Sequence, residues 1–270
     1  MMGFSVLMSV YGKEQPRYLR KSLESVFQQS LKPDEVVLVE DGPLTEELYS
    51  VLDEFEGRDE LKRVALAENG GLGRALNEGL KHCSYNLVVR MDTDDICFPD
   101  RFERQILFME AHPDIAASSG WIEEFEGEID HTVSVKRVPE TPEEIACYGK
   151  SRNPLNHPAV IFRKEAVEAV GGYRHFPLFE DWYLWARLMA NHYKLANLQT
   201  PILHFRTSPD MFKRRGGIKY AIDSFKFQMT LHRLGLISNA QAIKAGVMRG
   251  AVYVMPNFMR RLVYKTILRN

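Results

Sequence analysis

The side chains best suited to chemistry first gather in the stretch RMDTDDICFPDR, residues 90–101, where Asp92, Asp94 and Asp95 directly follow an apolar run. Carboxylates at positions i and i+2 of a strand end can present oxygens to one divalent cation, which keeps other coordination positions for phosphate oxygens. Such a cation would neutralise charge on a phosphate-bearing leaving group. A structural role is also open, in which Asp95 or Asp100 caps the following helix. The two roles are compatible, because Asp100 could cap while the earlier aspartates face a ligand.

A second acidic pair, Glu180 and Asp181, stands in the motif FEDW. A carboxylate there could take a proton from an attacking hydroxyl group. Alternatively, acidic residues in the first turn of a helix favour the helix dipole. Taken alone, this motif favours the structural interpretation.

The elements that must position these residues alternate along the chain. β-branched runs at 4–10 and 35–40 flank a segment with apolar side chains on one helical face, which predicts a strand, helix, strand unit. Helices are further expected at 45–55 and 72–83, and strands at 62–67 and 85–91. Alternation of this kind predicts an α/β fold with a mainly parallel sheet covered by helices.

After residue 100 the pattern is less regular. We expect a helix after Pro99, strands around 115–125, a helix near 142–149, a strand at 159–163, helices from Lys164 and from Glu180, and a basic helix at about 218–234. No internal repeat or low-complexity linker is found. The predicted organisation is one domain over residues 1–210 and a basic helical extension over residues 211–270.

Polar, acidic segments follow all four of the first predicted strands: SVYGKEQP, EDGP, ENGGLG and DTDD. Each could be ordinary turn chemistry when taken singly. Open parallel sheets, however, bind ligands at the carboxyl ends of their strands. If all four segments meet on one rim of the sheet, the repulsion between their carboxylates must be offset by a cation or by hydrogen bonds from a ligand.

Length and composition set the broad class. The chain of 270 residues with 45% hydrophobic residues can bury a large core, so disorder is not expected. We expect neither a secretory leader nor a membrane-spanning segment. The three cysteines contain no CxxC pair, which predicts reduced thiols and a cytoplasmic location.

The near-zero net charge of -1 hides a strong asymmetry. Residues 1–210 carry 23 Lys or Arg against 35 Asp or Glu, whereas residues 211–270 carry 12 against the single Asp223. The basic part is expected to have an anionic neighbour, which could be the acidic domain itself, a membrane surface, a phosphate-bearing substrate or nucleic acid.

Several rival functions can be compared. A dinucleotide-dependent oxidoreductase needs GxGxxG after the first strand, where this chain has SVYGKEQP. A nucleic-acid-binding module would leave the acidic rim unexplained, so no nucleic-acid partner is expected. A nucleotidyltransferase making sugar nucleotides stays open although a glycine-rich basic loop is lacking, as does an inactive nucleotide-sugar-binding protein.

The motif order SVLMSVYGKE, VVLVEDGP, ENGGLGRALNEGL, VVRMDTDDICFPDRFERQ and FEDWYLWARL resembles the inverting family-two glycosyltransferases of the GT-A fold. It is most similar to bacterial enzymes that build capsule, exopolysaccharide and O-antigen repeats. The resemblance covers about residues 4–215. It implies a GT-A-like domain that moves one sugar from a nucleotide-sugar, with a UDP-sugar favoured, to a saccharide hydroxyl.

The resemblance implies roles for the residues of each motif. Ser9, Tyr11 and Glu14 would lie beside the nucleotide, Asp41 would read its base, and Asn69 and Arg74 would line the nucleotide site. Glu40 stands where the family often has Asp, which leaves the base identity open. Asp94 would be a direct ligand of Mn2+ or Mg2+, and Asp92 would lie near the ribose or the metal.

The later motifs would serve the chemistry and the sugars. Asp181 matches the family's general base, Glu180 is its neighbour, and Trp182 could form an apolar platform for a sugar ring. His157 would line the sugar pocket, although a lone histidine is often structural. The segment HFRTSPDMFKRRGG carries His204, Arg206, Arg214 and Arg215, which could bind diphosphate oxygens unless they belong to a solvated basic stretch. The QxxRW pattern of processive members is absent, which predicts transfer of one sugar per encounter.

The basic C-terminal segment GVMRGAVYVMPNFMRRLVYKTILRN carries interleaved apolar residues and no acid. It could lie at a membrane interface or pack on the acidic domain. Similar enzymes use lipid-diphosphate-linked acceptors, so a peripheral position on the cytoplasmic face of the membrane is one expectation.

Overall fold

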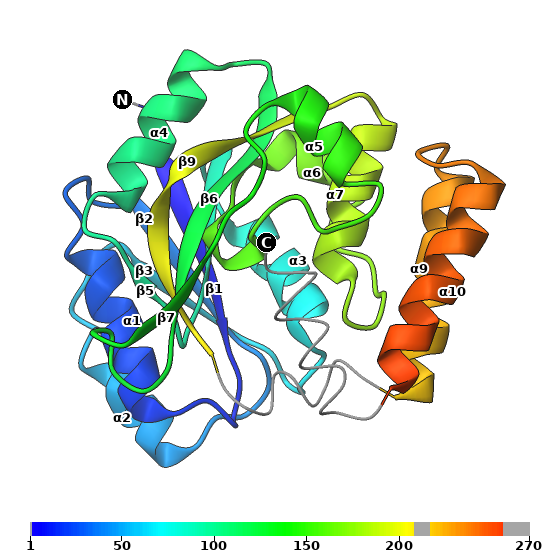
Figure 1. Cartoon of the computed structure of the whole chain (residues 1–270). Helices are drawn as coiled ribbons and strands as arrows, with labels where there is room; N and C mark the ends of the chain where they lie inside the picture. Colours follow the sequence, from blue (N-terminus) through cyan, green and yellow to red (C-terminus); the bar gives the residue numbers. More distant parts are fainter. Residues whose placement is uncertain (1, 208–216, 256–270) are drawn as a thin grey trace.

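A mixed β-sheet runs through the part of the protein that the computed structural model describes, residues 2–207 and 217–255 (Figure 1). Its strands are β1 (Phe4–Val10), β2 (Glu35–Glu40), β3 (Leu61–Ala65), β4 (Leu87–Asp92), β5 (Ile96–Cys97), β6 (Ile115–Phe125), β7 (Thr132–Lys136), β8 (Ile161–Arg163) and β9 (Lys194–Arg206). Their order in the sheet is β3-β2-β1-β4-β8-β6-β9-β5, with β7 beside β6. The first four strands in this order are mutually parallel, and β8 is antiparallel to both of its neighbours.

The helices are α1 (Pro16–Phe27), α2 (Glu46–Asp53), α3 (Leu72–His82), α4 (Arg101–Ala111), α5 (Pro142–Tyr148), α6 (Lys164–Ala169), α7 (Glu180–Ala190), α9 (Ile218–Arg233) and α10 (Asn239–Val254), with a 3-10 turn at His157–Ala159. Side chains of α1, α2 and α4 share one core with one face of the sheet, and those of α3, α6 and α7 share a second core with the other face. The sheet is therefore the middle of three layers.

Alternation within the central strands explains the two cores. In β2, Val36 and Leu38 pack in the first core, whereas Val37 and Val39 pack in the second. Successive side chains of a strand point to opposite faces, so a strand covered on both sides reads as a continuous apolar run. This is why the short apolar runs of the sequence predicted buried parallel strands correctly.

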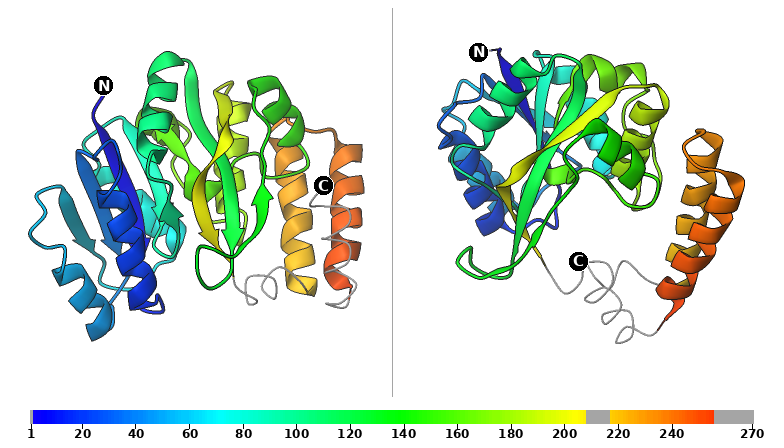
Figure 2. Two further views of the ribbon diagram at one scale, coloured as in Figure 1. Left: turned by 60° about the vertical axis from the view of Figure 1, so that its left-hand side comes forward. Right: turned by 45° about the horizontal axis from the view of Figure 1, so that its top comes forward.

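Helices α9 and α10 form a hairpin that lies beside α7 at the outside of the molecule (Figure 2). Phe227 and Leu231 of α9 are fully buried, in a cluster with Phe179, Trp182 and Tyr253. Gly246 of α10 gives the two helices their close approach, because a Cβ atom there would lie 2.4 Å from the Phe225 ring. The described part of the basic C-terminal region thus packs on the protein itself.

The structure differs from the sequence predictions in the second half of the chain. The 13-residue strand β9 and the short strands β5 and β7 were not predicted. The proposed caps are also wrong, since Asp100 occupies the N-cap position of α4 without a capping hydrogen bond and instead forms an ion pair with Arg104. Asp95 is buried within the turn between β4 and β5, where its carboxylate accepts a hydrogen bond from the Arg206 N–H instead of capping α4.

Candidate active site

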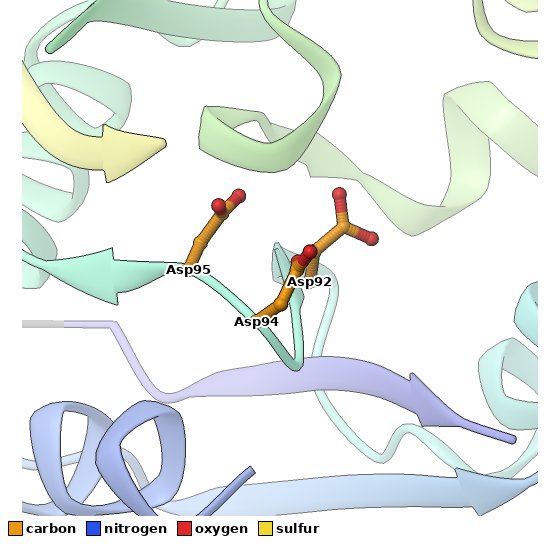
Figure 3. Close-up of side chains that lie close together, drawn as sticks. All are labelled: Asp92, Asp94 and Asp95. Atoms are coloured by element: carbon orange, nitrogen blue, oxygen red, sulfur yellow. The ribbon is translucent and has the colours of Figure 1, made fainter. Parts of the chain in front are cut away.

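Three aspartate side chains meet on the turn between β4 and β5. Asp92 ends β4, and Asp94 and Asp95 occupy the two positions before β5. Each contributes one carboxylate oxygen to a group whose members lie within 4.8 Å of one another, and Figure 3 shows the three carboxylates on the same side of the turn. Oxygen atoms grouped in this way suit a hard divalent cation. The aspartates that the sequence singled out are therefore brought together.

The electrostatics of this cluster also fit a cation. Burial and the charges of Asp92 and Glu14 raise the pKa of Asp94 to about 7. Burial and the charges of Asp94 and Asp92 raise the pKa of Asp95 well above its usual range. Among the described residues, Asp95 Oδ2 is buried without a hydrogen-bond partner. A bound cation would relieve this repulsion and favour the ionised carboxylates.

Two arginines hold the aspartate turn in place. The buried Arg90 donates hydrogen bonds from both terminal nitrogens to the carboxylate of Asp92, one of them over 2.9 Å. Arg206 donates from its backbone N–H to Asp95 Oδ1 over 2.8 Å and from Nε to the carbonyl oxygen of Asp94 over 2.9 Å. The end of β9 is thereby fastened to the turn, and Arg206 supports the backbone of the cluster.

The loop after β1 contacts the same turn. Ser9 pairs with Asp92 in the parallel ladder between β1 and β4. The hydroxyl of Thr93 lies 3.3 Å from the Ser9 carbonyl oxygen and 3.1 Å from Glu14 Oε2, and burial raises the pKa of Glu14. Tyr11 is 42% exposed, so its ring is accessible to a ligand. Ser9 and Glu14, two of the three residues predicted in this loop, therefore lie beside the aspartate turn.

Asp41 shapes the loop that precedes α3. Its carboxylate is buried and accepts hydrogen bonds from Asn69 Nδ2 over 3.0 Å, from Gly70 N–H over 2.7 Å and from Gly71 N–H over 3.0 Å. Gly42 has a positive φ of 81°, and a Cβ atom there would lie 2.5 Å from the backbone nitrogen of Asn69. The EDG and NGG motifs are therefore a pair of interlocking turns, which fixes where Asn69 is presented.

Two polar side chains of α3 have different surroundings. Arg74 is exposed and pairs with Glu68 over 3.0 Å. Asn77 donates from Nδ2 to the carbonyl oxygen of Tyr173 over 2.7 Å, and its Oδ1 accepts from the Tyr173 N–H over 2.7 Å. Arg74 thus lies in a solvent-exposed ion pair, whereas Asn77 fastens α3 to the segment that carries Tyr173.

A pocket of about 120 Å³ lies at the start of α7. It is lined by Leu72, Gly73, His157, Tyr173, Leu178, Glu180 and Asp181. Asp181 Oδ1 accepts a hydrogen bond from the Trp182 N–H over 2.7 Å, and its Oδ2 accepts one from Asn153 Nδ2 over 2.6 Å. These contacts fix the direction of a carboxylate that opens into the pocket.

His157 and the buried Tyr173 are hydrogen-bonding partners in the lining of this pocket. His157 Nε2 lies 2.9 Å from the hydroxyl of Tyr173. Burial, aided by the charge of Arg90, lowers the pKa of His157 well below its usual range, so the imidazole is neutral. Burial also raises the pKa of Tyr173, and the charges of Asp181 and Asp92 act in the same direction. Arg90, which holds Asp92, donates from its backbone N–H to the carbonyl oxygen of Val160 over 2.9 Å, so the strand that carries the aspartate turn lies beside the 3-10 turn of His157.

Glu180 lies beside Asp181 with a different partner. Its Oε1 is 3.4 Å from Nδ1 of His175, and burial raises the pKa of Glu180. The segment that leads into α7 includes Leu178, which is exposed and has a positive φ of 64°. Positive φ is costly for a leucine, and such strain gathers at functional sites.

The role predicted for Trp182 is corrected by its burial. Trp182 is only 4% exposed and packs on Phe227 of α9, with ring centroids 4.7 Å apart. Its indole N–H donates to the carbonyl oxygen of Gly149 over 3.0 Å. An indole held in this way anchors the C-terminal hairpin and presents no platform to a sugar. Helical geometry explains the outcome, because the residue after Asp181 points away from the pocket.

The predicted phosphate-binding group is only partly described. His204 stacks on Phe98 with centroids 4.1 Å apart and lies 3.4 Å from Glu123, and burial lowers its pKa. The ring is stacked and largely buried, and its role toward a diphosphate stays a prediction. Arg206, from the same motif, donates to the carbonyl oxygens of Asp94 and Gly127. Arg214 and Arg215 lie outside the described residues.

Sequence reasoning missed Asn153, Tyr173 and the supporting role of Arg90. Asn153 and Tyr173 come from loops before β8 and after α6, and no local motif marks either residue. Arg90 carried a signal, because an arginine inside a strand that is buried on both faces needs a carboxylate partner, and Asp92 stands two residues later.

Comparison with known proteins gives a clear relationship. The family described as glycosyl transferase family 2 matches residues 5–171. The chain is 40% identical over 266 residues to an Escherichia coli UDP-Gal:alpha-D-GlcNAc-diphosphoundecaprenol beta-1,3-galactosyltransferase, covering 98% of this chain and 96% of that protein. It is 42% identical over 262 residues to the amylovoran biosynthesis glycosyltransferase AmsE of Erwinia amylovora, covering 96% and 94%.

Solved structures share the fold at low sequence identity. The TarS fragment 1-349 of S. aureus in complex with UDP-GlcNAc has a TM-score of 0.62 and 18% identity, covering 83% of this chain and 67% of that one. The mannosyltransferase PcManGT from Pyrobaculum calidifontis, in complex with GDP-Man and Mn2+, has a TM-score of 0.65 and 16% identity, covering 99% and 80%. These similarities confirm the predicted GT-A-like fold. On the family match and the two full-length relatives, this chain belongs to glycosyl transferase family 2 and is a glycosyltransferase.

Proposed function

We propose that this protein transfers one sugar, with inversion, from a UDP-sugar to a hydroxyl group of a lipid-linked saccharide during the synthesis of a bacterial surface polysaccharide. One relative is named for a UDP-galactose donor and a diphosphoundecaprenol-linked acceptor, and another for amylovoran biosynthesis. The family relationship favours this function over a nucleotidyltransferase.

The observation that carries the proposal is the group of three carboxylates, Asp92, Asp94 and Asp95, at the end of β4 in a chain of glycosyl transferase family 2. Arg90, which holds Asp92, also bonds to Val160 beside the 3-10 turn of His157, and His157 and Asp181 line one pocket. Metal-assisted transfer of a sugar from a nucleoside diphosphate to a hydroxyl group uses a cation near the departing diphosphate and a general base near the attacking hydroxyl.

The nucleotide would lie along the rim formed by the ends of β1, β2, β3 and β4. Tyr11 is exposed for stacking, and Asp41 fixes the loop that presents Asn69. The carboxylate of Asp41 would read the base through the lone pair of Oδ1 that remains beside its bond from the Gly70 N–H. Arg74, exposed at the start of α3, would reach phosphate oxygens.

Asp94 and Asp92 would hold the divalent cation, with Asp95 behind them. Such an ion, Mn2+ or Mg2+, would supply neutralisation of the charge that develops on the departing diphosphate. Arg90 and Arg206 would keep the carboxylates and the turn in place while the nucleotide binds and leaves.

Asp181 would take the proton from the acceptor hydroxyl as that hydroxyl attacks. Its Oδ2 is directed by Asn153, and one lone pair of that oxygen stays available for the acceptor. His157 and Tyr173 would contact the sugars, because they are neutral hydrogen-bonding groups in the lining of the pocket. Glu180 would bind a sugar hydroxyl at the pocket edge.

Peripheral contact with a membrane is part of the proposal. The hairpin exposes apolar side chains on both helices, including Ile218 and Ile222 of α9 and Val247 of α10. The basic balance of residues 211–270 would add attraction to anionic lipids. Within the part of the chain that the structure describes, no helix is long and apolar enough to cross a membrane.

Calorimetric titration of the purified protein with UDP, GDP and CMP, each with Mn2+ and then with chelator, tests the donor site. We expect UDP to bind with Mn2+ and to bind much more weakly with chelator. Transfer from UDP-galactose to a lipid-diphosphate-linked GlcNAc, followed by NMR of the new anomeric linkage, tests the reaction. Binding of GDP in preference to UDP would overturn the UDP-sugar donor. Retention of the anomeric configuration would overturn inversion.

A further inference from the structure

A second cavity lies away from the aspartate turn, between α10 and the turn that follows α5. Its volume is about 330 Å³. Ile237, Ala245 and Met248 supply apolar surface, and Lys150, Lys244 and Arg249 supply positive charge, with no carboxylate among the lining residues. We call this cavity the α10 groove. Its lining suits a ligand that is apolar along its length and anionic at one end.

The two lysines of the α10 groove are available to a ligand. Lys150 and Lys244 are both exposed, and neither forms an ion pair with any residue in the ranges that the structure describes. One comes from the turn after α5 and the other from α10, so their charges approach the groove from two sides. Ammonium groups placed in this way can share the oxygens of a diphosphate.

Arg249 has a different task, because its guanidinium is already engaged. It donates to the carbonyl oxygen of Ser151 and, from Nη1, to the hydroxyl of Tyr253 over 3.2 Å. It also lies over the Trp182 ring, 5.3 Å from the centroid. Arg249 therefore closes the inner end of the groove and ties α10 to the turn.

The wall of the groove continues directly to the candidate base. The carbonyl oxygen of Gly149 accepts from the indole of Trp182, the residue after Asp181. Four residues further along, Asn153 donates to the Asp181 carboxylate over 2.6 Å. The three chain steps from the Cα atom of Lys150 to that of Asn153 can span at most about 11 Å. A ligand anchored in the groove would thus lie within the reach of a short saccharide from Asp181.

We propose that the α10 groove binds the lipid-diphosphate part of the acceptor, with the diphosphate at Lys150 and Lys244 and the first part of the lipid along Met248. This inference rests on the proposed function and deepens it, because it assigns a place to the acceptor's anchor. Binding there would hold the attached saccharide near Asp181 and exclude acceptors that lack the diphosphate.

Farnesyl diphosphate is a suitable probe, because it carries an isoprenoid chain and a diphosphate but no sugar. Its binding to the full chain is measured by calorimetry in the presence of chelator, which prevents the diphosphate from binding through a metal at the aspartate turn. Farnesol and inorganic diphosphate are titrated in parallel. We expect farnesyl diphosphate to bind more tightly than either fragment.

Matched pairs of variants locate the binding. Lys150→Gln with Lys244→Gln is compared with Lys219→Gln plus Lys226→Gln, two lysines of α9 outside the groove. The groove pair should weaken binding of farnesyl diphosphate by at least about tenfold, as expected for the loss of hydrogen bonds to a charged group. The α9 pair should leave the affinity unchanged.

A second pair tests the apolar wall. Met248→Gln is compared with Val247→Gln, since these neighbours are 60% and 61% exposed but only Met248 lines the groove. Only Met248→Gln should weaken binding. Equal affinity in the groove and control variants, or no binding of farnesyl diphosphate to the unmodified protein, would overturn the assignment. Metal-dependent binding of UDP is measured on the same samples, so failure of the groove is distinguished from failure of the proposed function.

Discussion

Asn153 and Asp181 are joined by a hydrogen bond of 2.6 Å although they lie 28 residues apart in the chain. The asparagine comes from the loop after α5, and the aspartate from the first turn of α7. This contact turns an acidic residue at a helix start into a directed carboxylate in a pocket. Asn153 is therefore a positioning residue, because it acts on the reaction through Asp181.

Replacing Asn153 tests this positioning. Asn153→Ala should lower kcat by about tenfold while the KM for the nucleotide sugar stays constant, because a hydrogen bond to a charged group is lost far from the nucleotide. Asn153→Ser, which keeps a donor, should recover part of the loss. The control is Asn191→Ala at the other end of α7, where the side chain bonds only to the Arg187 carbonyl oxygen among the contacts described. Equal kcat values for the two alanine variants would contradict the role of Asn153.

Asp181→Asn removes the proton acceptor and keeps the size of the side chain. Transfer should fall by about 10²- to 10⁴-fold, which is the usual contribution of a general base. Affinity for UDP with Mn2+ should stay within about twofold of the original value, a change of about 0.4 kcal/mol, because Asp181 is assigned to the acceptor and not to the nucleotide. Glu180→Gln is the matched control, since it changes the neighbouring carboxylate in the same way. Near-normal turnover of Asp181→Asn would show that another group is the base.

Asp94→Asn should act on nucleotide binding in place of proton transfer. Mutating a residue that only hydrogen-bonds to a metal ligand costs roughly 10- to 100-fold in metal affinity. Loss of a direct ligand should therefore weaken Mn2+-dependent UDP binding by more than this. Binding measured in chelator should be the same for the variant and the original protein. Asp100→Asn, a nearby aspartate engaged with Arg104, is the control. If Mn2+ still strengthened UDP binding to Asp94→Asn as much as in the original protein, Asp94 would not be a ligand of the cation.

Trp182→Ala separates an anchoring role from a sugar-binding role. Because the indole is buried between α7 and the C-terminal hairpin, its removal should cost about 3–5 kcal/mol of unfolding free energy. Thermal unfolding measures this loss. Trp182→Phe should recover much of the stability and leave KM for both substrates close to normal. A raised KM without any loss of stability would instead support the predicted role of Trp182 as a platform for a sugar ring.

The cysteines offer a chemical test of the core. Burial raises the pKa of Cys83 to about 12 and also raises the pKa of Cys97, so neither forms a reactive thiolate at pH 8. Cys147 is exposed on α5. Mass spectrometry after treatment with iodoacetamide should find one adduct on the folded protein and three after denaturation. Modification of Cys83 in the folded protein would show that the second core opens.

Local patterns determined the first half of the fold and the acidic turns. Apolar runs such as EVVLVE can be buried on two faces only as central strands, and the residues after such strands necessarily meet on one rim of a parallel sheet. The aspartates at 92, 94 and 95 are neighbours in the chain, so their closeness needed no tertiary information. The family-type motifs were recognisable for the same reason, since each is contiguous.

Tertiary structure decided everything that depends on contacts between distant segments. The direction of Trp182 follows from the packing of α7 against α9, and periodicity alone could not tell that face from the pocket face. The strand β9 is long and carries mixed polar and apolar residues, so only its pairing with β6 and β5 defines it. Asn153, Tyr173 and Arg206 reach the site from loops and strand ends separated by tens of residues. Their hydrogen bonds form only once the sheet has assembled. The sequence alone therefore identified the carboxylates of the site, whereas the tertiary structure identified the residues that orient those carboxylates.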